Sequence, residues 1–173
     1  MKKFLLFFIY FGFYLTESGI YSQELLKIGH VDVSEILSAL PETDSAKLLL
    51  EKDAKELNLM LENMHVEYNK LVDDFEINQD TYSELVKRTK QSEILEVQNK
   101  ITNFQKNASE QLQQRNVELL QPIYQKIQQA IDKVATEGKY TYILDISQGT
   151  VVFKSKDSQN INSLVLNELK LRK

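Results

Sequence analysis

The chain has 173 residues, a net charge of −4 and no cysteine, and these counts exclude several classes of protein. A general nucleic-acid binder needs a basic face, which this charge balance does not supply. Without cysteine there is no disulfide, no thiolate nucleophile and no cysteine-ligated zinc site. Since the sequence has two histidines, His30 and His65, it predicts no metal site and no cofactor.

The first 22 residues predict export. Lys2 and Lys3 precede a charge-free run of twelve residues, 4–15. A membrane-spanning helix needs about 20 apolar residues, so residues 1–22 are predicted as a signal peptide that is cut near Ser22 and Gln23. An uncleaved N-terminal anchor is the alternative. Cleavage removes two lysines and one glutamate and changes the net charge from −4 to −5.

The next segments predict a short strand and then long helices. Residues 27–33 are rich in β-branched side chains, which favour a strand. Between Pro41 and Pro122 lie 80 residues with neither glycine nor proline. Turns depend on these two residue types, so such a gap predicts long helices. Thr43 or Asp44 is the predicted N-cap of the first helix.

The first long helix carries a heptad repeat. Apolar residues recur at alternating steps of 4 and 3, the period of a left-handed coiled coil. These positions are Leu50, Ala54, Leu57, Leu61, Met64, Tyr68, Leu71 and Phe75. The repeat then weakens, and Thr81 and Glu84 have the spacing of a capping box. The tip of a hairpin is therefore predicted near residues 77–82.

A second apolar seam follows the tip. It runs through Val97, Ile101, Phe104, Ala108 and Leu112 and resumes as Leu120, Ile123, Ile127, Ala130 (or Ile131) and Val134. Pro122 lies inside this pattern and predicts a kink or a break near residues 119–122. Because the two helices have similar lengths, we expect residues 44–119 to form an antiparallel helical hairpin.

The C-terminal residues predict small β elements. Gly138 is a helix C-cap signal. Residues 140–145 and 151–154 are predicted strands of a β-hairpin with its turn at 147–149, and Ser158 or Asn160 precedes a final helix. Residues 23–43 and 120–173 would form a body. Its three short strands have marginal stability alone, so burial between subunits would stabilise them. The predicted fold class is α+β, a small β body with a long antiparallel α-helical coiled-coil hairpin.

With this arrangement the chain resembles the Skp/OmpH family of periplasmic chaperones. The resemblance is carried by Ile28, Val31, Asp32, Ile36, Leu40, Pro41, Glu42, the segments 142–145 and 151–153, Ile161, Val165 and Leu169. It implies a periplasmic homotrimer with arms around a cavity. In that cavity an ATP-independent holdase keeps unfolded outer-membrane proteins soluble until the membrane insertion machinery accepts them. No catalytic residue is expected, and the chain is predicted not to be an enzyme.

Three groups of residues are candidates for function. Apolar residues outside the seams are candidates for client binding: Leu59, Met60, Val66, Val72, Ile77, Val86, Ile94 and Leu95. Residues of the predicted strands are candidates for the trimer body: Ile28, Val31, Val33, Tyr142, Leu144, Val152 and Phe153. Lys87, Arg88 and Lys90 form a basic cluster near the tip.

The net charge of the predicted arm differs from that of the best-known family members. Residues 45–118 hold ten Lys and Arg against fourteen Asp and Glu, whereas the best-known family members are strongly basic. The acidic arm departs from this pattern, so we assign no lipopolysaccharide site from the resemblance, and weak contact with a membrane surface stays open. The alternative function is a structural coiled-coil spacer or adaptor of the cell envelope. Asp32 and Asp145 are predicted to end strands or accept turn hydrogen bonds rather than to act as an acid–base pair.

Overall fold

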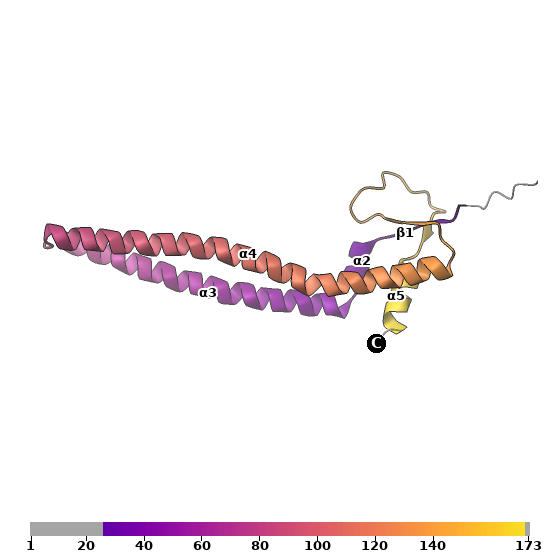
Figure 1. The fold of residues 1–173 in the computed structure, drawn as a ribbon, viewed down its shortest axis with the longest axis horizontal. Helices are drawn as coiled ribbons and strands as arrows, with labels where there is room; N and C mark the ends of the chain where they lie inside the picture. The colour runs from indigo at the N-terminus through magenta and orange to yellow at the C-terminus, as the bar shows by residue number, and fades with distance from the viewer. Residues whose placement is uncertain (1–25, 172–173) are drawn as a thin grey trace, which may run out of the picture.

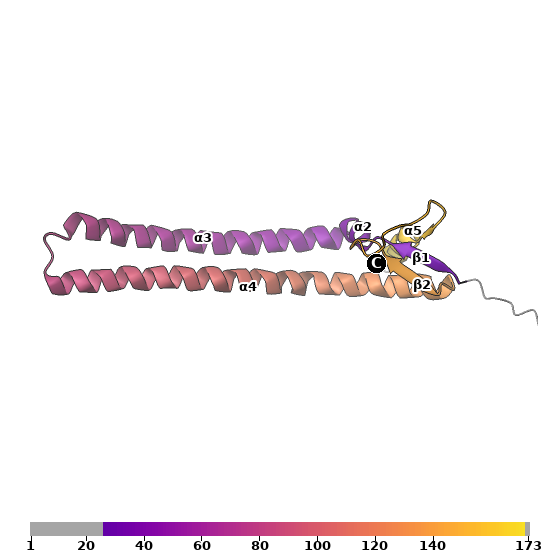
Figure 2. The same cartoon turned by 90° about the horizontal axis from the view of Figure 1, so that it is seen from above.

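The computed structural model describes residues 26–171, so the predicted signal peptide lies outside the described residues. Two long helices, α3 (Pro41–Asn78) and α4 (Glu84–Glu137), run antiparallel and side by side (Figures 1 and 2). At one end a small sheet, α2 (Val33–Ser38) and α5 (Asn162–Leu171) pack on them. We call this end the base and the rest of the α3–α4 hairpin the arm. The predicted α+β class with a long helical hairpin is confirmed.

The sheet has three short strands in the order β2-β1-β3. The central strand β1 (Ile28–Val31) pairs in parallel with β2 (Tyr142–Asp145) and, on its other edge, with β3 (Gln159–Asn160). Ile28 lies opposite Tyr142 and Val31 opposite Asp145. The hairpin arm forms the connection between β1 and β2, so the base is assembled from the two ends of the described chain.

The predicted β-hairpin over residues 140–154 is wrong. Residues 151–154 form no strand, and the side chains of Val152 and Phe153 are 97% and 83% exposed. The third strand is instead the polar pair Gln159–Asn160. A β-branched run forms a strand only where a neighbouring strand and an apolar face receive it, and within this single chain residues 151–153 have neither. Gln159 and Asn160 pair because they reach the free edge of β1.

Several helix ends differ from the predicted caps. The helix α3 begins at Pro41, with Leu40 as its N-cap, rather than after Thr43 or Asp44. Proline suits the first helical turn, where its missing N–H would have no partner. The N-cap of α4 is Ser83, whose hydroxyl accepts from the Val86 N–H, and not Thr81. The Thr81 hydroxyl donates instead to the Asn78 carbonyl at 2.7 Å, which closes the turn between the helices.

Pro122 does not break α4, which is continuous from Glu84 to Glu137. Figure 1 shows a change in direction within α4 near the base. Proline removes one helical hydrogen bond and its ring crowds the preceding turn. The turns after it are held by packing, because Ile123, Ile127 and Ala130 are buried in the core of the base. Of the predicted kink or break near residues 119–122, the break is therefore wrong, and the helix bends without being interrupted.

The predicted C-cap at Gly138 is confirmed, and it directs the chain into β2. The Tyr140 N–H donates to the Ala135 carbonyl and the Lys139 N–H to the Thr136 carbonyl. With Lys139 at φ 52°, these are the bonds of a Schellman motif. A Cβ on Gly138 would lie 2.5 Å from the Tyr140 ring, so glycine is needed here for close approach.

One hydrophobic core lies at the base. It joins β1, α2, α5 and the base ends of the long helices and consists of Val31, Ile36, Leu40, Ala46, Ile123, Ile127, Ala130, Ile131, Ile161, Val165 and Leu169. Polar contacts surround it: the Asp32 side chain caps α2 by accepting from the Glu35 N–H, and the Asn162 side chain accepts from the Asp32 N–H at 2.8 Å. The bond to Asn162 links the segment after β1 to the start of α5.

Candidate functional site

The arm is a narrow two-helix structure with a half-buried seam. All eight predicted heptad residues of α3, from Leu50 to Phe75, are half-buried between the helices, as are Phe104, Ala108 and Leu112 of α4. Val97 and Ile101 are buried. The predicted seams are therefore confirmed. A seam of this width leaves most of the surface of each helix open to solvent.

Three ion pairs cross between the helices along the hairpin. Lys126 binds Glu42 at 2.6 Å near the base, Arg115 binds Asp53 at 3.1 Å farther out, and Lys90 binds Asp74 at 3.0 Å near the tip. In each pair α3 supplies the carboxylate and α4 the cation. The pairs thus favour one register of the two helices in addition to the apolar seam.

The predicted client-binding residues fall into two groups. Most point to solvent, with exposed fractions from 38% to 79%: Leu59, Met60, Val66, Ile77, Val86 and Leu95. Val72 and Ile94 are half-buried and belong to the flanks of the seam. The arm therefore exposes large apolar side chains that its own folding does not need.

Sequence reasoning missed other exposed apolar residues along the long helices. These are Leu48, Leu49, Leu85, Val117 and Tyr124. Leu48 is 67% exposed and lies two positions from the seam residue Leu50, which places it on the opposite side of the helix. That spacing was the signal in the sequence that could have identified it.

The predicted trimer-body residues also divide by burial. Val31 is part of the core of this chain, and Val33 is half-buried against it. The others are exposed at the base: Ile28, Tyr142, Leu144, Val152 and Phe153. In β2 exposed and half-buried residues alternate, so one face of the strand meets the core and the other meets solvent. The base therefore carries an exposed apolar surface of its own.

Comparison with known proteins identifies the family. The family model described as outer membrane protein (OmpH-like) matches residues 27–169. The chain belongs to the OmpH-like family. The resemblance to the Skp/OmpH family is thereby confirmed. The fold is similar to the crystal structure of an OmpH-like protein from Caulobacter crescentus CB15, with a TM-score of 0.72, 13% sequence identity and 92% of each chain covered. A search of curated proteins gave no match.

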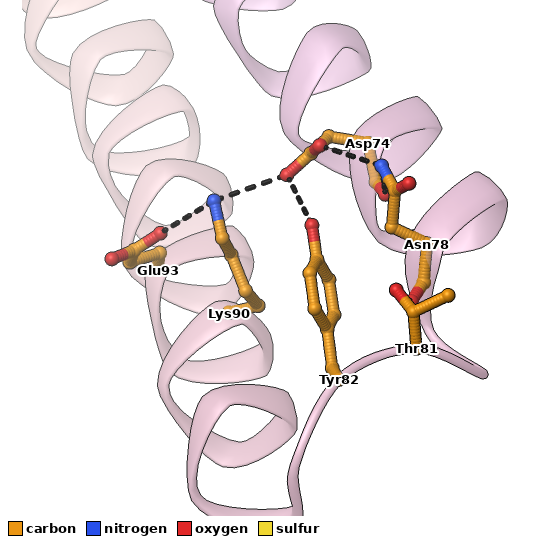
Figure 3. Close-up of polar contacts among 6 residues, drawn as sticks. All are labelled: Asp74, Asn78, Thr81, Tyr82, Lys90 and Glu93. Atoms are coloured by element: carbon orange, nitrogen blue, oxygen red, sulfur yellow. Dashed lines mark hydrogen bonds and ion pairs between the residues drawn. The ribbon is translucent and has the colours of Figure 1, made fainter.

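The tip of this OmpH-like arm is held by one carboxylate. Asp74 accepts hydrogen bonds from the Asn78 amide at 3.0 Å and the Tyr82 hydroxyl at 3.1 Å, and it pairs with Lys90 (Figure 3). Hydrogen bonding to Lys90, then to Tyr82, lowers the pKa of Asp74. The same bond to Asp74 raises the pKa of Lys90. The cluster therefore ties the end of α3, the connecting turn and the start of α4 together.

The predicted basic cluster is largely engaged within the chain. Lys90 pairs with Asp74 and lies 3.9 Å from Glu93, and Lys87 pairs with Glu84 at 3.3 Å. Arg88 is exposed. Since two of the three cations already face carboxylates, the cluster offers less free positive charge than the sequence indicates.

Polar side chains at the base take structural roles. Besides the cap made by Asp32, Asp145 accepts from the backbone N–H and the hydroxyl of Ser147, both at 2.9 Å. His30 is buried, and its burial, followed by the nearby Lys154, lowers its pKa. Among residues 26–171, no three His, Cys, Asp or Glu side chains come together as a metal site. No helix in this part of the chain is long and apolar enough to span a membrane.

Proposed function

We propose that this OmpH-like chain is an ATP-independent holdase chaperone of the periplasm. It binds unfolded outer-membrane β-barrel proteins in a cavity between helical arms and prevents their aggregation before insertion. The observation that carries this proposal is the set of large apolar side chains that the arm exposes outside its seam, such as Leu59 and Ile77. A coiled-coil spacer or adaptor would be expected to be polar there, so these residues favour the holdase.

The chemistry of the clients matches such a surface. Strands of an unfolded β-barrel protein alternate apolar and polar side chains, and their unpaired backbone groups promote aggregation. Exposed aliphatic residues, with Met60 among them, adapt to many sequences without strong selectivity. Binding the unfolded client lowers the concentration of free unfolded chain by mass action. Release then needs no nucleotide, because each contact is weak.

The proposed assembly is a homotrimer after removal of residues 1–22 in the periplasm. The body consists of residues 23–43 and 120–173, and the arm of residues 44–119. Exposed apolar residues of the base, including Tyr142, Leu144 and Phe153, support contacts between subunits. The partners are unfolded outer-membrane proteins and, through them, the insertion machinery of the outer membrane.

Aggregation of a denatured β-barrel protein tests the function. When the client is diluted from denaturant into buffer, light scattering should fall in the presence of an excess of this protein. No ATP should be needed. Scattering that is unchanged at that excess would contradict the holdase function and favour a spacer.

Replacement of Leu144 and Val152 with Asp tests the assembly. These side chains are 43% and 97% exposed in the single chain, so the charges are compatible with the fold of a subunit. Sedimentation should give the mass of a trimer for the native protein and that of a monomer for the double variant. A variant that keeps the trimer mass would show that subunits assemble elsewhere.

A further inference from the structure

The helix α3 carries a stripe of exposed aliphatic residues that the hairpin does not use. Its members are Leu48, Leu59, Val66 and Ile77, which are 67%, 59%, 46% and 79% exposed. They follow each other at steps of 11, 7 and 11 residues. With 3.6 residues per turn these steps are close to three, two and three whole turns. The four side chains therefore share one face of α3, which we call the outer stripe.

The outer stripe faces away from α4. Each member lies two residues from a seam residue: Leu48 from Leu50, Leu59 from Leu57 and Leu61, Val66 from Met64 and Tyr68, and Ile77 from Phe75. Two residues correspond to about 200° around a helix. The stripe is thus opposite the seam, and the 29 helical steps from Leu48 to Ile77 extend about 43 Å along the arm.

The charge of α3 is strongly negative, in contrast to that of α4. Between Pro41 and Asn78 there are ten acidic and four basic residues, a net charge of −6. Between Glu84 and Glu137 there are seven acidic and eight basic residues, a net charge of +1. Three of the acidic residues of α3, Glu42, Asp53 and Asp74, pair with cations of α4. Lys52 and Lys55 are exposed beside the base half of the stripe. Beside its tip half, Glu62, Glu67, Asp73 and Glu76 are exposed, and Lys70 is the one Lys or Arg among residues 61–78. The potential beside the tip half of the stripe therefore favours cations.

The helix α4 offers a weaker apolar surface. Its exposed large apolar residues are Leu85, Val86, Leu95, Val117 and Tyr124, spread over a helix of 54 residues. Six such residues belong to the 38 residues of α3, because Leu49 and Met60 flank the outer stripe. The apolar side chains are denser on α3, and only there do they lie within a strongly acidic helix.

We propose that the outer stripe is the main surface on which the arm binds unfolded polypeptide, and that it prefers segments with basic side chains between their apolar ones. This inference rests on the proposed holdase function and names the face and the client chemistry. An extended segment rises about 3.4 Å per residue, so roughly 13 residues span the stripe. Alternate side chains would contact the aliphatic residues. The side chains between them leave the backbone on the other face, but lysine and arginine are long enough to reach past the backbone to carboxylates that flank the stripe, such as Glu62 and Asp73.

A matched pair of double variants tests the choice of face. Leu59→Ser with Val66→Ser removes the middle of the stripe. Leu95→Ser with Val117→Ser removes residues from α4 that are exposed to a similar extent, 57% and 55%. Both pairs lie at exposed helix positions, and circular dichroism checks that folding is retained.

The probes are two fluorescent peptides of 13 residues with identical alternating apolar side chains. One has lysine at the intervening positions and the other glutamate, and binding is measured by fluorescence anisotropy on the full assembled protein. The native protein should bind the lysine peptide at least tenfold more tightly than the glutamate peptide. This preference should shrink in 0.5 M salt, because salt screens exposed charges. The α3 variant should lose about tenfold in affinity and the α4 variant less than twofold.

The opposite results would overturn the inference. It is overturned if the two variants lose peptide affinity equally, if the native protein binds the two peptides with equal affinity, or if it binds neither. A changed assembly mass in the α3 variant would also overturn it, because the stripe would then be an interface between copies of the chain. Suppression of client aggregation by the native protein and the two variants distinguishes a wrong outer stripe from a wrong holdase function. If both variants and the native protein suppress aggregation equally, the holdase stands and the outer stripe is wrong as its main binding surface.

Discussion

The base and the arm are held by different kinds of packing. In the base, Ile36, Ile127, Ile161 and Val165 are at most 1% exposed and share one core. In the arm, the heptad residues of α3 are only half-buried along a single seam. Because free energy from burial follows the area removed from water, the base should be the more stable region. The arm can then open or bend locally while the base stays folded.

This difference suits the proposed function. A binding surface that must accept many client sequences gains from local flexibility, whereas the base, which we propose joins the subunits, must keep its shape. The long helices connect the two regions, since α4 extends from the tip at Glu84 into the core at Ile127 and Ile131. We therefore expect substitutions in the base to affect the whole fold and substitutions in the arm to act locally.

The largest effect is expected from Ile127→Ala. Its side chain is 1% exposed at the centre of the core, and removing such a side chain leaves a cavity that costs about 2–5 kcal/mol. Urea denaturation should show this loss in the free energy of unfolding. Ile77→Ala is the control, because a side chain that is 79% exposed should change stability by less than ~0.5 kcal/mol. A loss in Ile127→Ala no larger than in this control would contradict the assignment of the core.

A smaller and local effect is expected from Leu61→Ala in the seam. Since Leu61 is half-buried, we expect a cost of about 1–2 kcal/mol, less than for a fully buried leucine. Hydrogen exchange should speed up at amides of the arm and remain unchanged in β1 and α5. Equal loss of protection in the base would show that the two regions unfold as one unit.

The smallest effect is expected at the tip, from Asp74→Asn. The pKa of Asp74 in the native protein lies below that of an ordinary aspartate, about 3.9. Its contribution is therefore present above that ordinary value and is lost as the pH falls through the native pKa. Hydrogen exchange of residues near the turn should increase in the variant, with no change in the base.

An NMR titration checks the same carboxylate directly. The Asp74 side chain should titrate below the ordinary aspartate value, because Lys90 and Tyr82 hydrogen-bond to its carboxylate and lower its pKa. If Asp74 titrates at the ordinary value, the contacts with Lys90 and Tyr82 in Figure 3 do not hold the tip in solution.

The sequence predicted the arm better than the sheet, for a physical reason. Seam residues such as Leu61 in α3 belong to a repeat with alternating steps of 4 and 3, which is typical of paired helices, so local pattern and tertiary packing agree. Gln159 and Asn160 of β3 are not among the β-branched and aromatic residues that favour strands, and they pair because the edge of β1 is available. Val152 and Phe153 have strand propensity and form no strand within the single chain.

In the candidate site, too, the sequence predicted what local pattern decides and missed what depends on tertiary contacts. Exposure of Leu59 and Ile77 followed from their positions outside the heptad, and the structure agrees. The engagement of Lys87 and Lys90 by Glu84 and Asp74 depends on side-chain geometry at the turn. A run of basic residues in the sequence does not reveal which of them already face carboxylates.

Hydrogen exchange of the assembled protein, with and without a bound unfolded β-barrel client, would show where the client binds. We expect the client to slow exchange along the arm, residues 44–119, and to leave the strands and α5 of the base unchanged, because binding stabilises the segments that carry the contacts. Slower exchange confined to the base, with the arm unaffected, would contradict this expectation.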